Sequence, residues 1–212
     1  MTLFRGLGEA VLTRFAPHHR PVMRSFDKTV SSVPGVHFDL RTGSLDIRVV
    51  PDSGDLRVHC DVRSRDPELA EQIGITVSDD ESGLRRIGFY GPFEIDGNTA
   101  CSVDALLEIP SGVALSVHTS LGNIHAVGIT STFKIACSMG NAYVALSPQW
   151  QAGEIDIATG MGNIDLSIPT GLPFHVHAGT SLGNESITYQ SHDDGFQARV
   201  HSRMGNISVK NS

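Results

Sequence analysis

The sequence has few of the residues on which disulfides, metal sites and aromatic clefts depend. Its 212 residues include three cysteines, one tryptophan and 6% aromatic residues. Cys60, Cys101 and Cys137 are odd in number and lack metal-ligand spacing, so they predict a reducing compartment and neither a disulfide framework nor a zinc site. There is also no Cys-x-x-Cys, no His-Glu-x-x-His and no phosphate-binding glycine loop with lysine. We therefore expect no cofactor.

Long apolar runs and excess positive charge are missing as well. No apolar run approaches the roughly 18 residues that a transmembrane helix needs. The net charge of −7 argues against a general nucleic-acid surface. No secretory signal is seen, so the sequence predicts a cytoplasmic protein.

Residues 1–25 differ from the rest of the chain. Phe4, Leu7, Val11 and Phe15 fall on one helical face, and four arginines accompany a single glutamate. The segment lacks the apolar stretch of a secretory signal. It predicts either an amphipathic helix that caps the fold, a mitochondrial-type presequence or membrane-peripheral anchor, or a flexible arm.

The organising feature of the chain is a short phrase that ends in Gly-Asn and returns five times, at spacings of 18, 22, 21 and 22 residues. Such a near-constant period indicates a repeat architecture. The pairs are Gly122 and Asn123, Gly140 and Asn141, Gly162 and Asn163, Gly183 and Asn184, and Gly205 and Asn206.

Apolar and polar residues alternate with period two on both sides of each pair, which is the pattern of a strand with one buried face. Each repeat is then a strand, a tight turn at Gly-Asn, and a second strand. These features predict an all-β fold, a single-stranded parallel β-solenoid (β-helix) with coils of about 21 residues. Its stacked asparagines would form a structural ladder. The residues that directly precede the turn glycines are all large and apolar, and we expect them to form a second column that is buried under the turns as an apolar plug. They are Leu121, Met139, Met161, Leu182 and Met204.

The segment Leu-Glu-Ile-Pro-Ser-Gly-Val-Ala-Leu-Ser-Val at residues 107–117, followed by Gly-Asn turns in series, resembles the putative-adhesin β-solenoid family, also called toast-rack-like. The resemblance extends from about Phe26 to the end of the sequence. It implies a repeat fold without agreed catalytic residues, and many such proteins lie at the bacterial envelope.

The domain prediction follows from this pattern. Residues 26–212 form one β-solenoid domain, with an irregular half at 26–112 and regular repeats at 113–212. Within the irregular half, Asp66 and Pro67 have the composition of an N-cap and first helical position, so a short helix to about Ile73 is expected.

Two patterns suggest chemistry, and neither is convincing. Residues 179–183 match the Gly-x-Ser-x-Gly nucleophile pattern, but a strand follows where that motif needs a helix. In-register stacking would bring Glu154 beside His175 and Asp156 beside His177, a set of candidate metal ligands. Exposed pairs of opposite charge are also ordinary features of sheets, so no metal and no catalytic residue is predicted.

The last predicted strand indicates an interface. A strand at Ile207 and Val209 with only Lys210 to protect it would leave an uncovered end of the stack. This predicts self-association, such as a homo-oligomer, or binding of a protein partner there.

The function predicted from these features is a non-enzymatic, adhesin-like scaffold or protein-interaction module. The alternative is a ligand- or glycan-binding β-helix protein, which requires a cleft with converging polar and aromatic groups. Trp150 is the one tryptophan available for such a cleft, unless it folds onto the edge of the core instead.

Overall fold

The computed structural model describes residues 21–51, 53–81 and 83–212. Most of the predicted amphipathic segment lies outside these ranges. Its last residues belong to strand β1, which begins at Val22. The boundary expected between residues 25 and 26 therefore falls inside a strand, and the capping and targeting roles stay predictions.

The described residues form two large sheets and one small hairpin. Sheet A contains, in spatial order, β1 (Val22–Ser31), β4 (Asp55–Ser64), β9 (Cys101–Ile109), β3 (Leu45–Val49), β11 (Ile124–Ile129), β13 (Ala142–Leu146), β15 (Ile164–Ile168), β19 (Ile207–Asn211) and β17 (Glu185–Ile187). Sheet B contains β16 (Phe174–Leu182), β18 (Phe196–Met204), β14 (Ile155–Met161), β12 (Phe133–Met139), β10 (Ala114–Leu121), β2 (Gly35–Thr42), β6 (Arg85–Tyr90) and β5 (Gly74–Asp79). The hairpin pairs β7 (Glu94–Ile95) with β8 (Asn98–Thr99).

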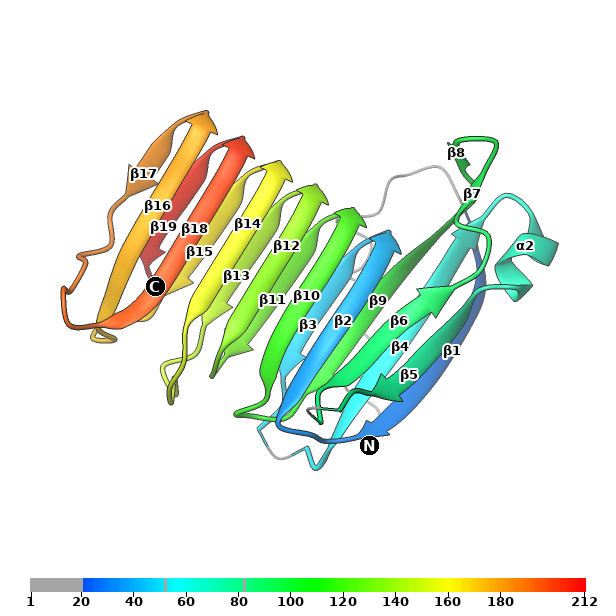
Figure 1. Ribbon diagram of the computed structural model, residues 1–212, viewed down its shortest axis with the longest axis horizontal. Coiled ribbons are helices and arrows are strands. Elements are labelled where there is room, and N and C mark those ends of the chain that lie inside the picture. Colours follow the sequence, from blue (N-terminus) through cyan, green and yellow to red (C-terminus); the bar gives the residue numbers. More distant parts are fainter. Residues whose placement is uncertain (1–20, 52, 82) are drawn as a thin grey trace.

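The two sheets form two layers whose strands lie side by side along the long axis of the molecule (Figure 1). Strand β12 shows how the sequence produces this arrangement. Phe133, Ile135 and Cys137 are buried, whereas the residues between them are exposed. Because the inward rows of both sheets are mostly apolar, one continuous core runs between the layers. Each large apolar side chain buried there contributes about 1.5–3 kcal/mol.

From β10 onward, each repeat contributes a strand to sheet B and the following strand to sheet A. Neighbouring strands in this region pair parallel and in register, so that Ile135 lies between Val117 and Ile157. The turn glycines join the two layers. Gly140 has a φ of +147°, and a Cβ atom there would lie 1.9 Å from the carbonyl oxygen of Gly122. Only glycine fits this position.

The asparagines that follow these glycines form a hydrogen-bonded column. Oδ1 of each accepts the backbone N–H of the next, at 2.8–3.0 Å, in the order Asn123, Asn141, Asn163, Asn206, Asn184. A bond between side-chain amides is added at one step, from Asn141 Nδ2 to Asn123 Oδ1 at 3.2 Å. The column therefore ties the turns of neighbouring strands together.

The predicted single-stranded parallel β-solenoid is wrong, because both large sheets are mixed. Strand β4 pairs antiparallel with β1 and with β9, and β5 pairs antiparallel with β6. Period-two alternation identifies the side chains that face the core, but it is the same for either direction of a neighbouring strand. Direction depends on the connections, and the short sequence separation between the end of β5 at Asp79 and the start of β6 at Arg85 permits an antiparallel pair.

Strand order also departs from chain order at the end distant from β1. Strand β18 lies between β14 and β16, and β19 lies between β15 and β17. Strands β18 and β19, the last two in the chain, are thus inserted between the rest of the sheets and strands β16 and β17. Strands β16 and β17 form the margin of the two sheets at this end (Figure 1).

The one described helix was predicted correctly. Helix α2 spans Pro67–Glu71, and the Asp66 side chain accepts the N–H of Glu68 as its N-cap. No helix in the described ranges is long and apolar enough to cross a membrane.

Candidate binding faces

The outer face of sheet A carries a single row of side chains that crosses all nine strands. The strand registers place one residue of each strand in this row. At two places in the row, an aspartate and a histidine stand next to each other. The members in spatial order are Asp27, His59, Leu106, Asp46, His125, Tyr143, Asp165, Ser208 and Ser186.

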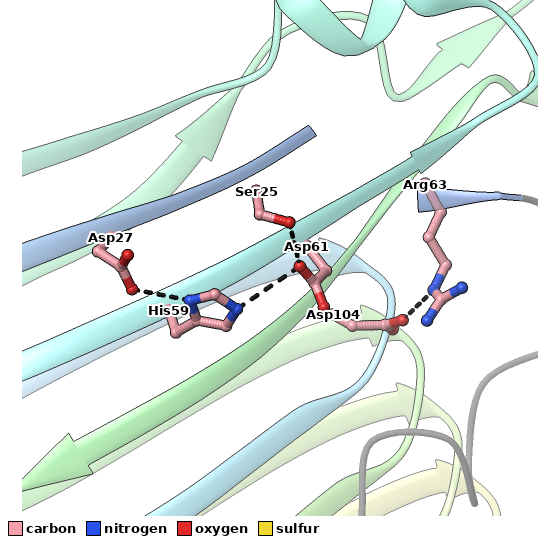
Figure 2. A network of polar contacts seen from close by, with 6 residues as sticks. All are labelled: Ser25, Asp27, His59, Asp61, Arg63 and Asp104. Atoms are coloured by element: carbon pink, nitrogen blue, oxygen red, sulfur yellow. Dashed lines mark hydrogen bonds and ion pairs between the residues drawn. The ribbon is translucent and has the colours of Figure 1, made fainter. Parts of the chain in front are cut away.

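The first pair belongs to a network of polar contacts on β1 and β4 (Figure 2). His59 Nδ1 lies 2.7 Å from Asp27 Oδ1, and its Nε2 lies 3.5 Å from Asp61 Oδ1. Ser25 Oγ donates to the same Asp61 oxygen at 2.5 Å. The serine hydroxyl is directed to a carboxylate and not to the histidine, whereas the nucleophile of a Ser-His-Asp triad needs a histidine to take its proton.

Arg63 and Asp104 form an ion pair beside this network (Figure 2). The Asp104 side chain is only 2% exposed, and its Oδ1 also accepts the N–H of Ser44 at 3.1 Å. A carboxylate removed from water to this extent is destabilising unless it is paired. These contacts join β4, β9 and the turn before β3, so we interpret the pair as structural.

The second pair supports an exposed aromatic ring. Asp46 has a side chain only 6% exposed, and its Oδ1 lies 2.9 Å from His125 Nδ1. The His125 ring stacks on Tyr143, with ring centroids 4.9 Å apart and planes at 28°. The buried aspartate therefore holds the imidazole, and the imidazole holds one side of the Tyr143 ring.

A small pocket lies between this row and the asparagine column. Its volume is about 130 Å³, and Asn123, Asn141 and Asn163 line one side. Tyr143 and Asp165 line the other. Asp165 Oδ2 accepts from Lys210 Nζ at 3.1 Å, whereas its Oδ1 has no hydrogen-bond partner among the described residues. Polar and aromatic groups thus converge in one place.

The outer face of sheet B carries a larger and shallower hollow of about 620 Å³. Small side chains form its floor, since Ala136 and Ala158 are register neighbours and Gly160 lies close by. His118 borders one side and His201 the other.

Five large apolar residues, which we call the ridge, follow the end of these strands at the turns. They stand in register on five adjacent strands and are each about 39–66% exposed. They were predicted to be a buried plug, which is wrong: they directly precede the turn and lie at the margin of the two layers. In spatial order the ridge consists of Leu121, Met139, Met161, Met204 and Leu182.

The charges around the hollow are mainly basic. Arg203 and His201 line it, and Arg203 forms no ion pair with any described residue. On the opposite side, His118 Nδ1 lies 3.3 Å from Asp39 Oδ1. The hollow is therefore an apolar surface with an unneutralised guanidinium beside it.

The expected meeting of Glu154 with His175 and of Asp156 with His177 does not occur. Strand β18 lies between β14 and β16, and His177 therefore faces Arg199. Glu154 instead contacts Lys134 at 2.5 Å and Arg199 at 3.4 Å. The hydrogen bond from Lys134 is the main reason that the pKa of Glu154 lies below its ordinary value. In the described ranges, no group of three or more metal-ligating side chains is placed to hold a metal ion.

The expected uncovered end at β19 is also wrong. Ile207 and Val209 are buried in the core between the sheets. Strands β15 and β17 flank β19 on both sides, so neither edge of this strand is uncovered. Lys210 pairs with Asp165 and does not stand at an edge. At this end of the molecule, the marginal strands are β16 and β17.

The free edge of β16 is largely occupied by the chain itself. The N–H of Phe174 donates to the Tyr189 hydroxyl at 2.8 Å, and the N–H of Thr180 donates to Glu185 Oε1 at 2.8 Å. The N–H of Val176 donates to Ser191 Oγ at 3.0 Å. Side chains thus occupy donors that an added strand would need, which disfavours pairing with a second chain at this edge.

Trp150 and the cysteines belong to the core. Trp150 is 7% exposed and packs against Phe174 and Phe196, with centroids 5.2 and 6.0 Å away. Cys60, Cys101 and Cys137 are free and buried. Burial raises the pKa of Cys60 to about 12 and that of Cys137 to about 11, so neither is a thiolate at neutral pH.

Sequence reasoning missed the row on sheet A, although the repeat contained a signal for it. Asp46, His125, Tyr143 and Asp165 each follow a turn glycine by three residues. Aligning the outward-facing residues after each turn, as was done for the inward-facing residues, would have shown this row.

The fold occurs in a protein from Clostridium sporogenes described as a "putative cell adhesion protein", with a TM-score of 0.67 and 11% identity over 89% of this chain and 100% of that one. A "putative adhesin" from Bacteroides fragilis is 12% identical over 89% and 97% of the chains with a TM-score of 0.31. Another from Parabacteroides distasonis is 15% identical over the same shares with a TM-score of 0.32. No protein-family profile and no curated protein matches the sequence. The first likeness shows a shared fold, and the TM-scores of the other two are too low to add to it.

Proposed function

We propose that this chain is a non-enzymatic, adhesin-like interaction module that binds an apolar segment of another protein along the ridge and hollow of sheet B. The fold shared with the Clostridium sporogenes protein described as a "putative cell adhesion protein" is consistent with this role. The lack of a thiolate at Cys60 and Cys137, and the bond from Ser25 to Asp61, favour binding over nucleophilic catalysis.

The exposed ridge is the observation that carries the proposal. With strands about 4.8 Å apart, five adjacent residues extend over roughly 19 Å. Monomeric proteins seldom expose a contiguous apolar surface without a use for it, and such patches mark interaction sites. Three of the five residues are methionines, whose flexible thioethers adapt to different apolar partners.

The charge beside the ridge indicates the chemistry of the partner. Arg203 is unpaired within the described residues and borders the hollow. A segment with apolar residues for the ridge and a carboxylate for Arg203 would match both features, since a guanidinium can form two parallel hydrogen bonds with a carboxylate (bidentate binding). We therefore expect an acidic, apolar peptide segment.

Selection from a random peptide display library on the immobilised protein tests this proposal. We expect enrichment of peptides that combine apolar residues with Asp or Glu. The double variant Met161→Gln and Met204→Gln should reduce their binding at least about tenfold, because two central contacts are lost.

Val127→Gln is the matched control. Val127 is as exposed as Met161 but lies on sheet A, so this variant should bind like the parent protein. Failure to enrich any peptide, or equal loss with Val127→Gln, would refute the proposal.

A further inference from the structure

We propose that the pocket beside Tyr143 on the outer face of sheet A is a binding subsite for one uncharged sugar residue. This site lies on the opposite sheet from the ridge and does not depend on the function proposed for it. The inference rests on the arrangement of one aromatic ring and several unpaired polar atoms around a pocket of about 130 Å³.

The aromatic surface is held in place before any ligand arrives. Tyr143 is 37% exposed, so part of its ring is available for contact. The stacked imidazole of His125 and the buried carboxylate of Asp46 restrict how the ring can turn. A preformed aromatic surface lowers the entropic cost of binding and suits the apolar C–H face of a sugar ring.

Unpaired hydrogen-bonding atoms lie beside this ring. Among the described residues, Nδ2 of Asn123 and Nδ2 of Asn163 make no hydrogen bond, because only the Oδ1 atoms of these residues are used in the column. Asp165 Oδ1 lacks a partner as well but is shielded from solvent. The acceptor that a ligand can reach is Oδ2 of the same carboxylate, whose side chain is 37% exposed and which also accepts from Lys210. The pocket thus offers two donors and one acceptor. Hydroxyl groups, which both donate and accept, match this combination.

The charges of the pocket favour a neutral ligand. An anion would approach the carboxylates of Asp46 and Asp165, so repulsion disfavours it. An ammonium group has donors only and would leave both asparagine amides without an acceptor. Lys210 already pairs with Asp165, which weakens the attraction for a cation. A hydroxylated, uncharged ring satisfies all of these groups.

The size of the pocket limits the ligand to a single ring or its edge. Sites that enclose drug-sized ligands usually have volumes of at least roughly 300 Å³. The volume of this pocket, about 130 Å³, is smaller. We therefore expect weak binding of a free monosaccharide, with a Kd of about 1 mM, because few atoms of the ligand are in contact.

Titration of the isotope-labelled protein with single monosaccharides, followed by amide NMR shifts, tests the proposal. Glucose, galactose, mannose and N-acetylglucosamine are the uncharged probes, and glucosamine and glucuronate are the charged ones. At least one uncharged sugar should shift the amides of residues 123–125, 141–143 and 163–165 in a saturable manner. Tyr143→Ala should weaken this binding at least about tenfold, and Tyr143→Phe should retain most of it because the ring remains.

Tyr90→Ala is the matched control, since Tyr90 is an exposed tyrosine on sheet B. It should bind the sugar like the parent protein, as should the double variant Met161→Gln and Met204→Gln. The absence of saturable shifts with every uncharged sugar at about 20 mM, some twenty times the expected Kd, overturns the proposal. Binding of glucosamine or glucuronate alone, or equal loss with Tyr90→Ala, also overturns it.

Discussion

The two halves of the molecule hold their strands together in different ways. From β10 to β19, strands pair parallel, and the Gly-Asn turn within each repeat uses the same glycine and the same asparagine bond to its neighbour. Among β1, β4 and β9, pairing is antiparallel and a buried ion pair between Arg63 and Asp104 joins the strands. A sequence repeat therefore identifies contacts that recur, whereas contacts made once leave no periodic signal.

Gly140→Ala should cause the largest loss and affect the repeat half. The new Cβ would lie 1.9 Å from the Gly122 carbonyl oxygen, and this backbone atom cannot move without disturbing the column. We expect a loss of about 4 kcal/mol or more in the free energy of unfolding, measured with urea. Gly54→Ala is the control, since nothing lies within 4 Å of its Cβ position, and it should change stability by less than about 0.5 kcal/mol.

Arg63→Met should be the corresponding break in the antiparallel half. It leaves the buried Asp104 carboxylate without its guanidinium, and we expect a loss of about 3 kcal/mol. Adding Asp104→Asn removes the charge but keeps an acceptor for the Ser44 N–H, so the double variant should be more stable than Arg63→Met. A double variant less stable than the single one would contradict the assignment of a structural ion pair.

Asn163→Ala should weaken the column at one step. It removes the acceptor of the Asn206 N–H, and such a bond contributes about 1 kcal/mol. Asn98→Ala provides the comparison, because within the described part of the chain the Asn98 side chain bonds only to the nearby Asp96 carbonyl in the small hairpin. If both variants lost the same stability, the column would not be a special feature of the repeat half.

The smallest effect concerns pH and the exposed face of sheet B. The pKa of Glu154 is lowered chiefly by Lys134 and secondarily by Arg199. A carboxyl with a lowered folded pKa stabilises the fold above its unfolded pKa, and this contribution disappears as the pH falls through the folded pKa. NMR titration should show the Glu154 pKa below its ordinary value of 4.5 and closer to it in Lys134→Met. An unchanged pKa in that variant would exclude Lys134 as the main cause.

The sequence predicted the features that depend on local alternation. The buried positions of β12, the turn glycines and helix α2 follow from periodicity and capping alone. The mixed direction of the strands could not be predicted in this way, because alternation is the same in parallel and antiparallel pairs. The position of β18 between β14 and β16 was not predicted either, and that error misplaced His175 and His177 relative to Glu154 and Asp156.

The candidate sites were harder to predict than the core. The ridge was expected inside because Met139 and its equivalents continue the alternation of inward-facing residues. They are the last residues before the turn, however, where the strand has passed the margin of the core, so they are exposed. The Tyr143 pocket combines residues far apart in the sequence, and only register brings Asp46 next to His125. The glycan-binding alternative had focused on Trp150, which is buried. The cytoplasmic location stays a prediction.

The insertion of β18 and β19 has a consequence for synthesis on the ribosome. Strands β16 and β17 emerge first, but their neighbours in the finished sheets are residues 196–211, which emerge later. Until those residues leave the exit tunnel, β14 and β15 expose the positions that β18 and β19 will occupy. A nascent chain paused in this interval could dock β16 directly on β14, since both strands follow the same alternation, and would have to release it before maturation.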